Sequence, residues 1–95
     1  MQVKEIYNHW LPPLIGADAI TFGNIILYGM PEDKVWSVLR KHEMVHVEQY
    51  AKYGVVRFLI IYIYEYLVGR LKGLDDKQAY RNIGFEKEAF EKQKL

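Results

Sequence analysis

Two histidines and a glutamate that lie close together in the chain are the residues best suited to chemistry. The segment reads His42-Glu43-Met44-Val45-His46, so the two imidazoles are four residues apart. Residues four apart share one face of a helix, which lets both imidazoles reach a single metal ion. In motifs of this kind the glutamate accepts a proton from the water on the metal. The spacing therefore predicts a zinc site with Glu43 as general base.

A helix must carry this motif, and the surrounding chain has the pattern of one. We expect a helix of about twenty residues, because Pro31 suits a first turn and Gly54 suits a C-terminal end. Apolar residues recur between them at helical spacing, and His42 and His46 continue the apolar stripe. The imidazoles are therefore expected to point into the domain, where a metal ion is sheltered.

A catalytic zinc ion needs a third protein ligand and one open position. The chain has no cysteine, so that ligand must be a histidine or a carboxylate. His9 lies in a segment without a helical pattern, whereas Glu86 and Glu88 lie in a predicted last helix, residues 85–94. Glu86 shares its face with apolar residues and Glu88 lies in a charged row, so we favour Glu86 over Glu88. The alternative is that both are solvated surface carboxylates.

The remaining elements are predicted from shorter patterns. Residues 19–22 and 25–28 are β-prone runs joined by a Gly-Asn pair, which predicts a β-hairpin. Residues 55–71 are apolar around most of a helix, which is typical of a buried backing helix. If that helix leaves an apolar patch uncovered, we expect the chain to form a homodimer, because small domains rarely expose large apolar patches.

The chain is long enough for one domain only, which we place at residues 1–95. Its first sixteen residues have no clear period, and Pro12-Pro13 is expected to break any helix there. The expected class is α+β. It combines a small sheet, a long active-site helix, a buried backing helix and a C-terminal helix that carries Glu86.

Composition excludes several classes of partner. The net charge is +1, from 13 basic and 12 acidic residues without a basic stripe, so nucleic acid is not an expected partner. The longest apolar stretch, residues 55–68, is shorter than the roughly 20 residues of a membrane-spanning helix, and it carries two charges. The N-terminus lacks the apolar run of a signal peptide. We therefore expect no membrane span and a cytoplasmic location.

The histidine motif and the segment around Glu86 together resemble the gluzincin metallopeptidases. In that group the third zinc ligand is a glutamate on a separate "glutamate helix", and here residues 86–89 read Glu-Lys-Glu-Ala, forty residues after His46. The small size, the extension His-Val-Glu-Gln at 46–49 and the stretch 80–86 are similar to the minimal members, the minigluzincins. The resemblance covers roughly residues 19–95, and the histidine motif is its most specific part.

The resemblance implies a zincin-like fold and a zinc-dependent peptidase that hydrolyses peptide or protein substrates. It implies that His42, His46 and Glu86 are the zinc ligands and that Glu43 is the general base. Members of the group also stabilise the oxyanion with a tyrosine or histidine. Tyr80 is the nearest candidate, although a role in the core stays open for it.

Three further expectations come from the resemblance. A strand of the hairpin, residues 25–28, would offer an edge to an extended substrate. Minimal members are thought of as latent, with terminal segments over the cleft, and residues 1–16 would do this here. Related peptidases often place an aspartate four residues after the ligand to support a histidine. This chain has Phe90 there, so the support must come from elsewhere.

Two other functions are compatible with the residues. The first is a zinc-stabilised binding or regulatory domain with little or no turnover, since a small domain can use a metal ion for stability. The second is a metal-free helical interaction module in which the histidine pair is accidental. Glu43 separates the first of these from a peptidase, because only a peptidase needs its carboxylate.

Overall fold

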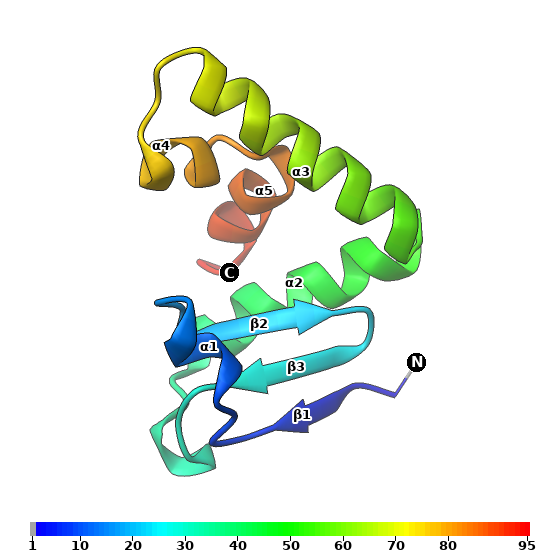
Figure 1. Cartoon of the computed structure of the whole chain (residues 1–95). Helices are drawn as coiled ribbons and strands as arrows, with labels where there is room; N and C mark the ends of the chain where they lie inside the picture. The colour runs from blue at the N-terminus through cyan, green and yellow to red at the C-terminus, as the bar shows by residue number, and fades with distance from the viewer. Residues whose placement is uncertain (1) are drawn as a thin grey trace.

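The computed structural model describes residues 2–95 and shows a three-stranded sheet with a long helix packed behind it and the C-terminal helices beyond one edge of the sheet (Figure 1). The predicted α+β class is confirmed, with five α-helices and one small sheet among these residues. None of the helices in this part of the chain is long and apolar enough to cross a membrane. The elements follow in the order β1 Lys4–Ile6, α1 Leu11–Leu14, β2 Ala19–Phe22, β3 Ile25–Tyr28, a 3-10 helix Glu32–Lys34, α2 Ser37–Tyr53, α3 Val55–Leu71, α4 Asp76–Arg81 and α5 Gly84–Lys92.

The sheet has the strand order β1-β3-β2, with β1 parallel and β2 antiparallel to the central strand β3. The predicted hairpin is confirmed, and Gly23 in its turn has a φ of 62°, which glycine adopts without strain. The prediction that residues 25–28 form an open edge is wrong, because β1 pairs with β3 on the side opposite β2. The edge strand that packs on α2 is β2.

The N-terminal segment is ordered, so the prediction that residues 1–16 are irregular is wrong over the described residues 2–16. Strand β1 takes its hydrogen bonds from β3, about twenty residues further along the chain, which no local pattern shows. Helix α1 has Pro12 and Pro13 in its first turn, where a missing backbone N–H costs no helical hydrogen bond. The Pro12 side chain is fully buried.

The motif helix α2 is shorter than expected at its N-terminus. Residues 32–34 form only a 3-10 turn, and the backbone at Val35 and Trp36 is extended before the helix begins at Ser37. The side chain of Val35 packs on the cluster between the sheet and α2, so tertiary packing overrides the local helical pattern. The C-terminal end is as predicted, since Gly54 ends α2 with a φ of 83°.

Helix α2 lies between two apolar clusters and is thereby held on both sides. One cluster, between the sheet and α2, contains Ile26, Tyr28 and Val47. The other joins α2 to α3 and α5, with the Phe58 ring stacked 4.4 Å from Phe85. Helix α5 lies across α2 and inside the turn formed by α3 and α4 (Figure 1). This crossing brings the C-terminal helix against the histidine motif.

Helix α3 has the predicted bounds, but the prediction that it is buried is wrong for one of its two faces. Only Phe58 and Gly69 are buried, while six large apolar side chains are 53% to 87% exposed. The helix packs on α2, α4 and α5 with one side only, and no described element covers the other. The exposed residues are Val56, Ile60, Ile63, Tyr64, Leu67 and Leu71.

Glu5→Gln is expected to destabilise the fold by about 1 kcal/mol at neutral pH, in thermal or denaturant unfolding. The Glu5 carboxylate accepts hydrogen bonds from Arg40 Nε and Tyr28 Oη, both 2.8 Å long, and thus ties β1 to β3 and α2. The bond from Arg40 lowers the pKa of Glu5. The stabilisation is therefore present above the ordinary pKa of a glutamate and is lost as the pH falls below it. Equal acid sensitivity in the variant and the wild type would contradict this role.

Candidate metal centre

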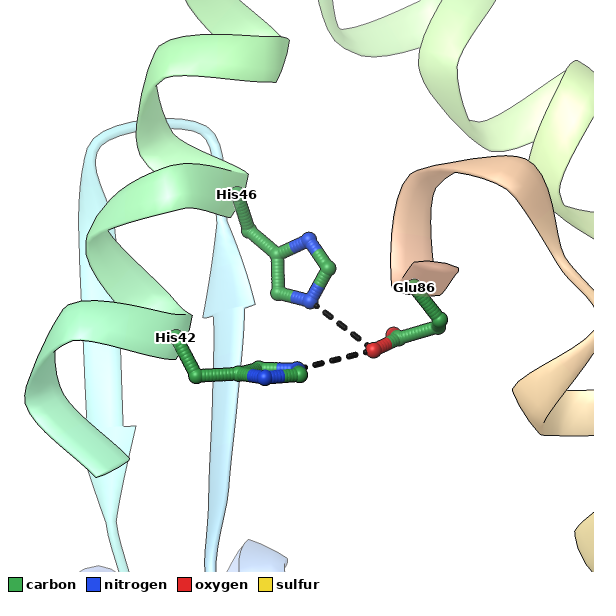
Figure 2. Close-up of side chains that lie close together, drawn as sticks. All are labelled: His42, His46 and Glu86. Carbon is green, nitrogen blue, oxygen red and sulfur yellow. Dashed lines mark hydrogen bonds and ion pairs between the residues drawn. The ribbon is translucent and has the colours of Figure 1, made fainter. Parts of the chain in front are cut away.

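Two helices bring three predicted ligands together at a buried point. His42 and His46 extend from α2 and Glu86 extends from α5, and the three side chains point towards one another (Figure 2). Glu86 Oε1 lies 2.9 Å from His42 Nε2 and 3.2 Å from His46 Nε2. All three residues are buried, and one ligand atom from each lies within 4.8 Å of the others. The three residues, called the triad below, can hold a metal ion.

The hydrogen-bond network around His46 determines which of its two ring nitrogens carries the proton and which one faces Glu86 as an acceptor. Gln49 Nε2 donates to the Phe85 carbonyl at 3.0 Å and to Glu88 Oε1 at 2.6 Å, so the Gln49 oxygen must face His46 Nδ1, 2.8 Å away. His46 Nδ1 therefore carries a proton and donates it. In the neutral imidazole, Nε2 then has a lone pair directed at the Glu86 carboxylate. Two acceptors that face each other need a cation between them, either a proton or a metal ion.

His42 is oriented in a similar way by a residue near the C-terminus. Its Nδ1 lies 2.6 Å from Gln93 Oε1, and the Phe90 ring packs edge-on against the imidazole at 4.6 Å. Support for the histidines therefore comes from two glutamine amides rather than from a carboxylate at position 90. Neither Gln49 nor Gln93 was predicted, because their roles depend on how α5 crosses α2.

The charge state of Glu86 suits a metal ligand. Burial raises the pKa of this carboxyl, but when a proton takes the place between it and the imidazoles, the hydrogen bonds with His42 and His46 outweigh burial and hold the pKa well below its usual range. Tyr62 Oη donates a further hydrogen bond of 2.6 Å to Glu86 Oε2. For His46, burial lowers the pKa, and its hydrogen bond to Glu86 raises it more. Glu86 is thus an ionised carboxylate with one oxygen directed at the imidazoles.

Glu88, the alternative ligand, is placed elsewhere. Its side chain is exposed and contacts Gln49 and Lys92, the latter at 3.3 Å. His9 is also outside the triad, because its Nδ1 accepts the Leu11 backbone N–H at 3.1 Å. Among the described residues, the triad therefore joins the histidine pair to Glu86 and not to Glu88 or His9.

Glu43 is buried beside the triad and is held by the edge strand. Its Oε1 accepts a hydrogen bond of 2.8 Å from Thr21 Oγ1 on β2. Burial raises the pKa of Glu43, against the opposing effects of His46 and the Thr21 bond. A carboxylate with a raised pKa is a better proton acceptor from water than an exposed one. Glu43 is therefore a buried carboxylate with a raised pKa, held next to the triad by β2.

A cavity of about 990 Å³ opens onto Glu43 and the triad. Its walls come from β2 and residues 15–18 on one side, from α2 at its base, and from α3, α4 and α5 on the other side. Only Ile15 and Gly16 of residues 2–16 line it, and β1 lies at the far edge of the sheet. The N-terminal segment therefore leaves most of the cavity uncovered.

Two tyrosines line this cavity next to Glu86. Tyr80 was predicted, and burial together with the charge of Glu86 raises the pKa of its hydroxyl. Tyr62 was not predicted, because the chain has eight tyrosines and nothing in the sequence distinguishes this one. It reaches Glu86 only because it lies on the face of α3 that packs against the other helices. Both hydroxyls stay protonated at neutral pH and can donate hydrogen bonds into the site.

Comparison of the chain with protein-family models, with curated proteins and with solved structures finds no match. The interpretation of the site therefore depends on its own geometry and chemistry.

Gln93→Ala is expected to weaken metal binding by roughly 10- to 100-fold, because the variant loses the oxygen that orients His42. Competition with a metal-sensitive chelator dye would measure the change. Gln2→Ala is a matched control, since Gln2 is exposed and lies outside the lining of the cavity. An affinity equal to that of the control would show that Gln93 does not orient the ligand.

Proposed function

We propose that this chain is a zinc-dependent metallopeptidase of the gluzincin type, built on a minimal zincin-like domain. His42, His46 and Glu86 bind one zinc ion, and Glu43 is the general base. The observation that supports this most strongly is the meeting of two imidazole nitrogens and an ionised carboxylate from separate helices, with a second buried glutamate beside them.

The donor set suits zinc. Two neutral imidazoles and one carboxylate are ligands that zinc takes in catalytic sites, with a fourth position left for water. Neighbouring donor atoms around a tetrahedral zinc ion with bonds of about 2.0–2.2 Å lie roughly 3.3–3.5 Å apart. The distances of 2.9 and 3.2 Å to Glu86 Oε1 are close to this range, so small movements of the side chains would admit the ion.

When bound, zinc would polarise the scissile carbonyl and lower the pKa of a water molecule at the site. Glu43 would accept a proton from the water that attacks the peptide carbon and would later deliver a proton to the leaving amine. The Thr21 hydroxyl holds the Glu43 carboxylate towards the cavity. Tyr80, which lines the same cavity, is our candidate for a hydrogen bond to the oxyanion.

The edge of β2 supplies a binding surface for an extended peptide. All four residues of β2 line the cavity, and the strand pairs with β3 on its other side. Tyr50 Oη donates to the Thr21 carbonyl at 3.2 Å, which holds this edge against α2. A substrate that pairs with β2 as an added strand would carry its backbone past the triad. The substrate class is therefore an extended peptide or an unfolded segment of a protein.

A second function, a zinc-stabilised binding domain without turnover, is supported by one observation. The triad joins α5 to α2, so a bound ion would hold the C-terminal helix in place whether or not catalysis occurs. Peptide binding at the edge of β2 does not need Glu43 as a base, whereas peptide hydrolysis does.

Incubation of the zinc-loaded chain with a peptide library, followed by mass spectrometry of the new termini, tests the proposal. We expect cleavage that a chelator abolishes and zinc restores. Tight peptide binding without cleavage would favour the binding domain, and neither binding nor cleavage would contradict both functions.

A further inference from the structure

The exposed face of α3 has the composition of a buried one. Its six apolar residues, called the α3 stripe, are Val56, Ile60, Ile63, Tyr64, Leu67 and Leu71. At 100° per residue they fall within about 100° of arc on the helix surface. A stripe of this width is typical of a helix face that packs on something. The opposite face already packs on α2, α4 and α5, so α3 has two apolar faces and the fold covers only one.

The stripe is symmetric about the middle of the helix. Along the helix axis, Ile63 and Tyr64 are adjacent at the centre of the stripe. Ile60 and Leu67 lie at equal distances on either side of this centre, and Val56 and Leu71 lie at equal distances beyond them. A second copy of α3, turned end for end by a twofold axis, therefore places an apolar residue opposite every apolar residue. Such self-complementarity is what a symmetric homodimer requires.

The charged residues that border the stripe fit the same arrangement. Arg57 lies about 20° beyond one side of the stripe and Arg70 about 20° beyond the other, at 100° per residue. In an antiparallel twofold pair, Arg57 of one copy and Arg70 of the other lie on opposite sides of the contact between the two α3 stripes. Both stay in solvent, so like charges do not meet across the apolar contact, as in the polar rim of an interface.

We propose that α3 pairs antiparallel with α3 of a second copy of this chain, about a twofold axis next to Ile63 and Tyr64. Each side chain of this kind buries on the order of 100 Å², so twelve of them bury roughly 1,200 Å². This is at the lower end for a specific interface, which indicates a dimer that dissociates in the micromolar range. The proposal does not depend on the peptidase function.

Sedimentation equilibrium of the full chain across the micromolar range tests the dimer. The mass should rise from the 11.3 kDa of one chain towards twice that value. Ile63→Glu should abolish the rise, because it buries a carboxylate next to the twofold axis. Leu14→Glu is a matched control, since Leu14 is 71% exposed on α1, and it should dimerise like the wild type. Circular dichroism shows whether each variant keeps its fold.

Cysteine cross-linking tests the register, and the chain has no cysteine of its own to interfere. In the proposed pair each Ile60 faces Leu67 of the other copy, whereas the two Ile60 residues are roughly 10 Å apart along the axis, too far for a disulfide. A mixture of the Ile60→Cys and Leu67→Cys proteins should therefore cross-link several-fold more than either protein alone. Equal cross-linking in all three samples would overturn the antiparallel register.

A constant monomer mass at all concentrations would overturn the proposal. Binding of the monomer to phosphatidylglycerol vesicles through the same stripe, lost in Ile63→Glu, would overturn it in favour of an anionic membrane surface as the occupant.

Discussion

Glu43→Gln is expected to abolish peptide hydrolysis and to leave the metal bound. Glu43 lies beside the triad without belonging to it, so zinc loses no ligand. The glutamine oxygen can still accept the hydrogen bond from Thr21, which preserves the local packing. A general base contributes roughly 10²- to 10⁴-fold to a rate. The value of kcat/KM on a library-selected peptide should fall by at least the lower figure, with the zinc content unchanged.

Glu48→Gln is the matched control for this variant. Glu48 lies on the same helix, its side chain is exposed, and it does not line the cavity of the triad. The control should hydrolyse the peptide at the wild-type rate. Equal activity of the Glu43→Gln and Glu48→Gln proteins would contradict a catalytic role for Glu43. If the wild type itself binds the peptide without cleaving it, and Glu43→Gln binds it equally well, the chain is the binding domain.

Glu86→Gln is expected to remove most of the zinc affinity and the stability that zinc provides. The variant keeps the volume of the side chain and an oxygen for Tyr62, but loses the negative charge that faces His42 and His46. Zinc at 1,000 times its dissociation constant stabilises the wild type by about 4 kcal/mol. For a chain of this size that corresponds to a Tm increase of roughly 15–30 °C. Calorimetry with and without zinc should show this increase in the wild type and little of it in the variant.

Glu88→Gln provides the comparison, because Glu88 is two residues away on the same helix and contacts Gln49 and Lys92 instead of the imidazoles. Its Tm should respond to zinc almost as the wild type does. A zinc response lost in Glu88→Gln and kept in Glu86→Gln would move the third ligand to Glu88.

The parts of the fold that the sequence predicts well are those with local signals. The hairpin has a Gly-containing turn between two β-prone runs, and α2, α3 and α5 end close to their predicted C-terminal positions. The histidine spacing and the apolar neighbours of Glu86 are also local, and they predict residues that the fold does bring together.

The features that the sequence does not predict depend on contacts between distant segments. Strand β1 has only three residues and forms because β3 is there to pair with it. The start of α2 moves to Ser37 because Val35 packs on the sheet. Gln49, Tyr62 and Gln93 gain their roles only when α5 crosses α2 and α3, so neither their residue type nor their spacing marks them.

X-ray absorption at the zinc edge is the most direct test of the triad as a zinc site. The zinc-loaded wild type should hold one ion per chain, with four nitrogen or oxygen neighbours at about 2.0–2.2 Å and the scattering pattern of two imidazole rings. His46→Ala should lose the ion or show a single ring. Zinc that does not bind in a one-to-one ratio, or the same two-ring spectrum in the His46→Ala protein, would contradict the site.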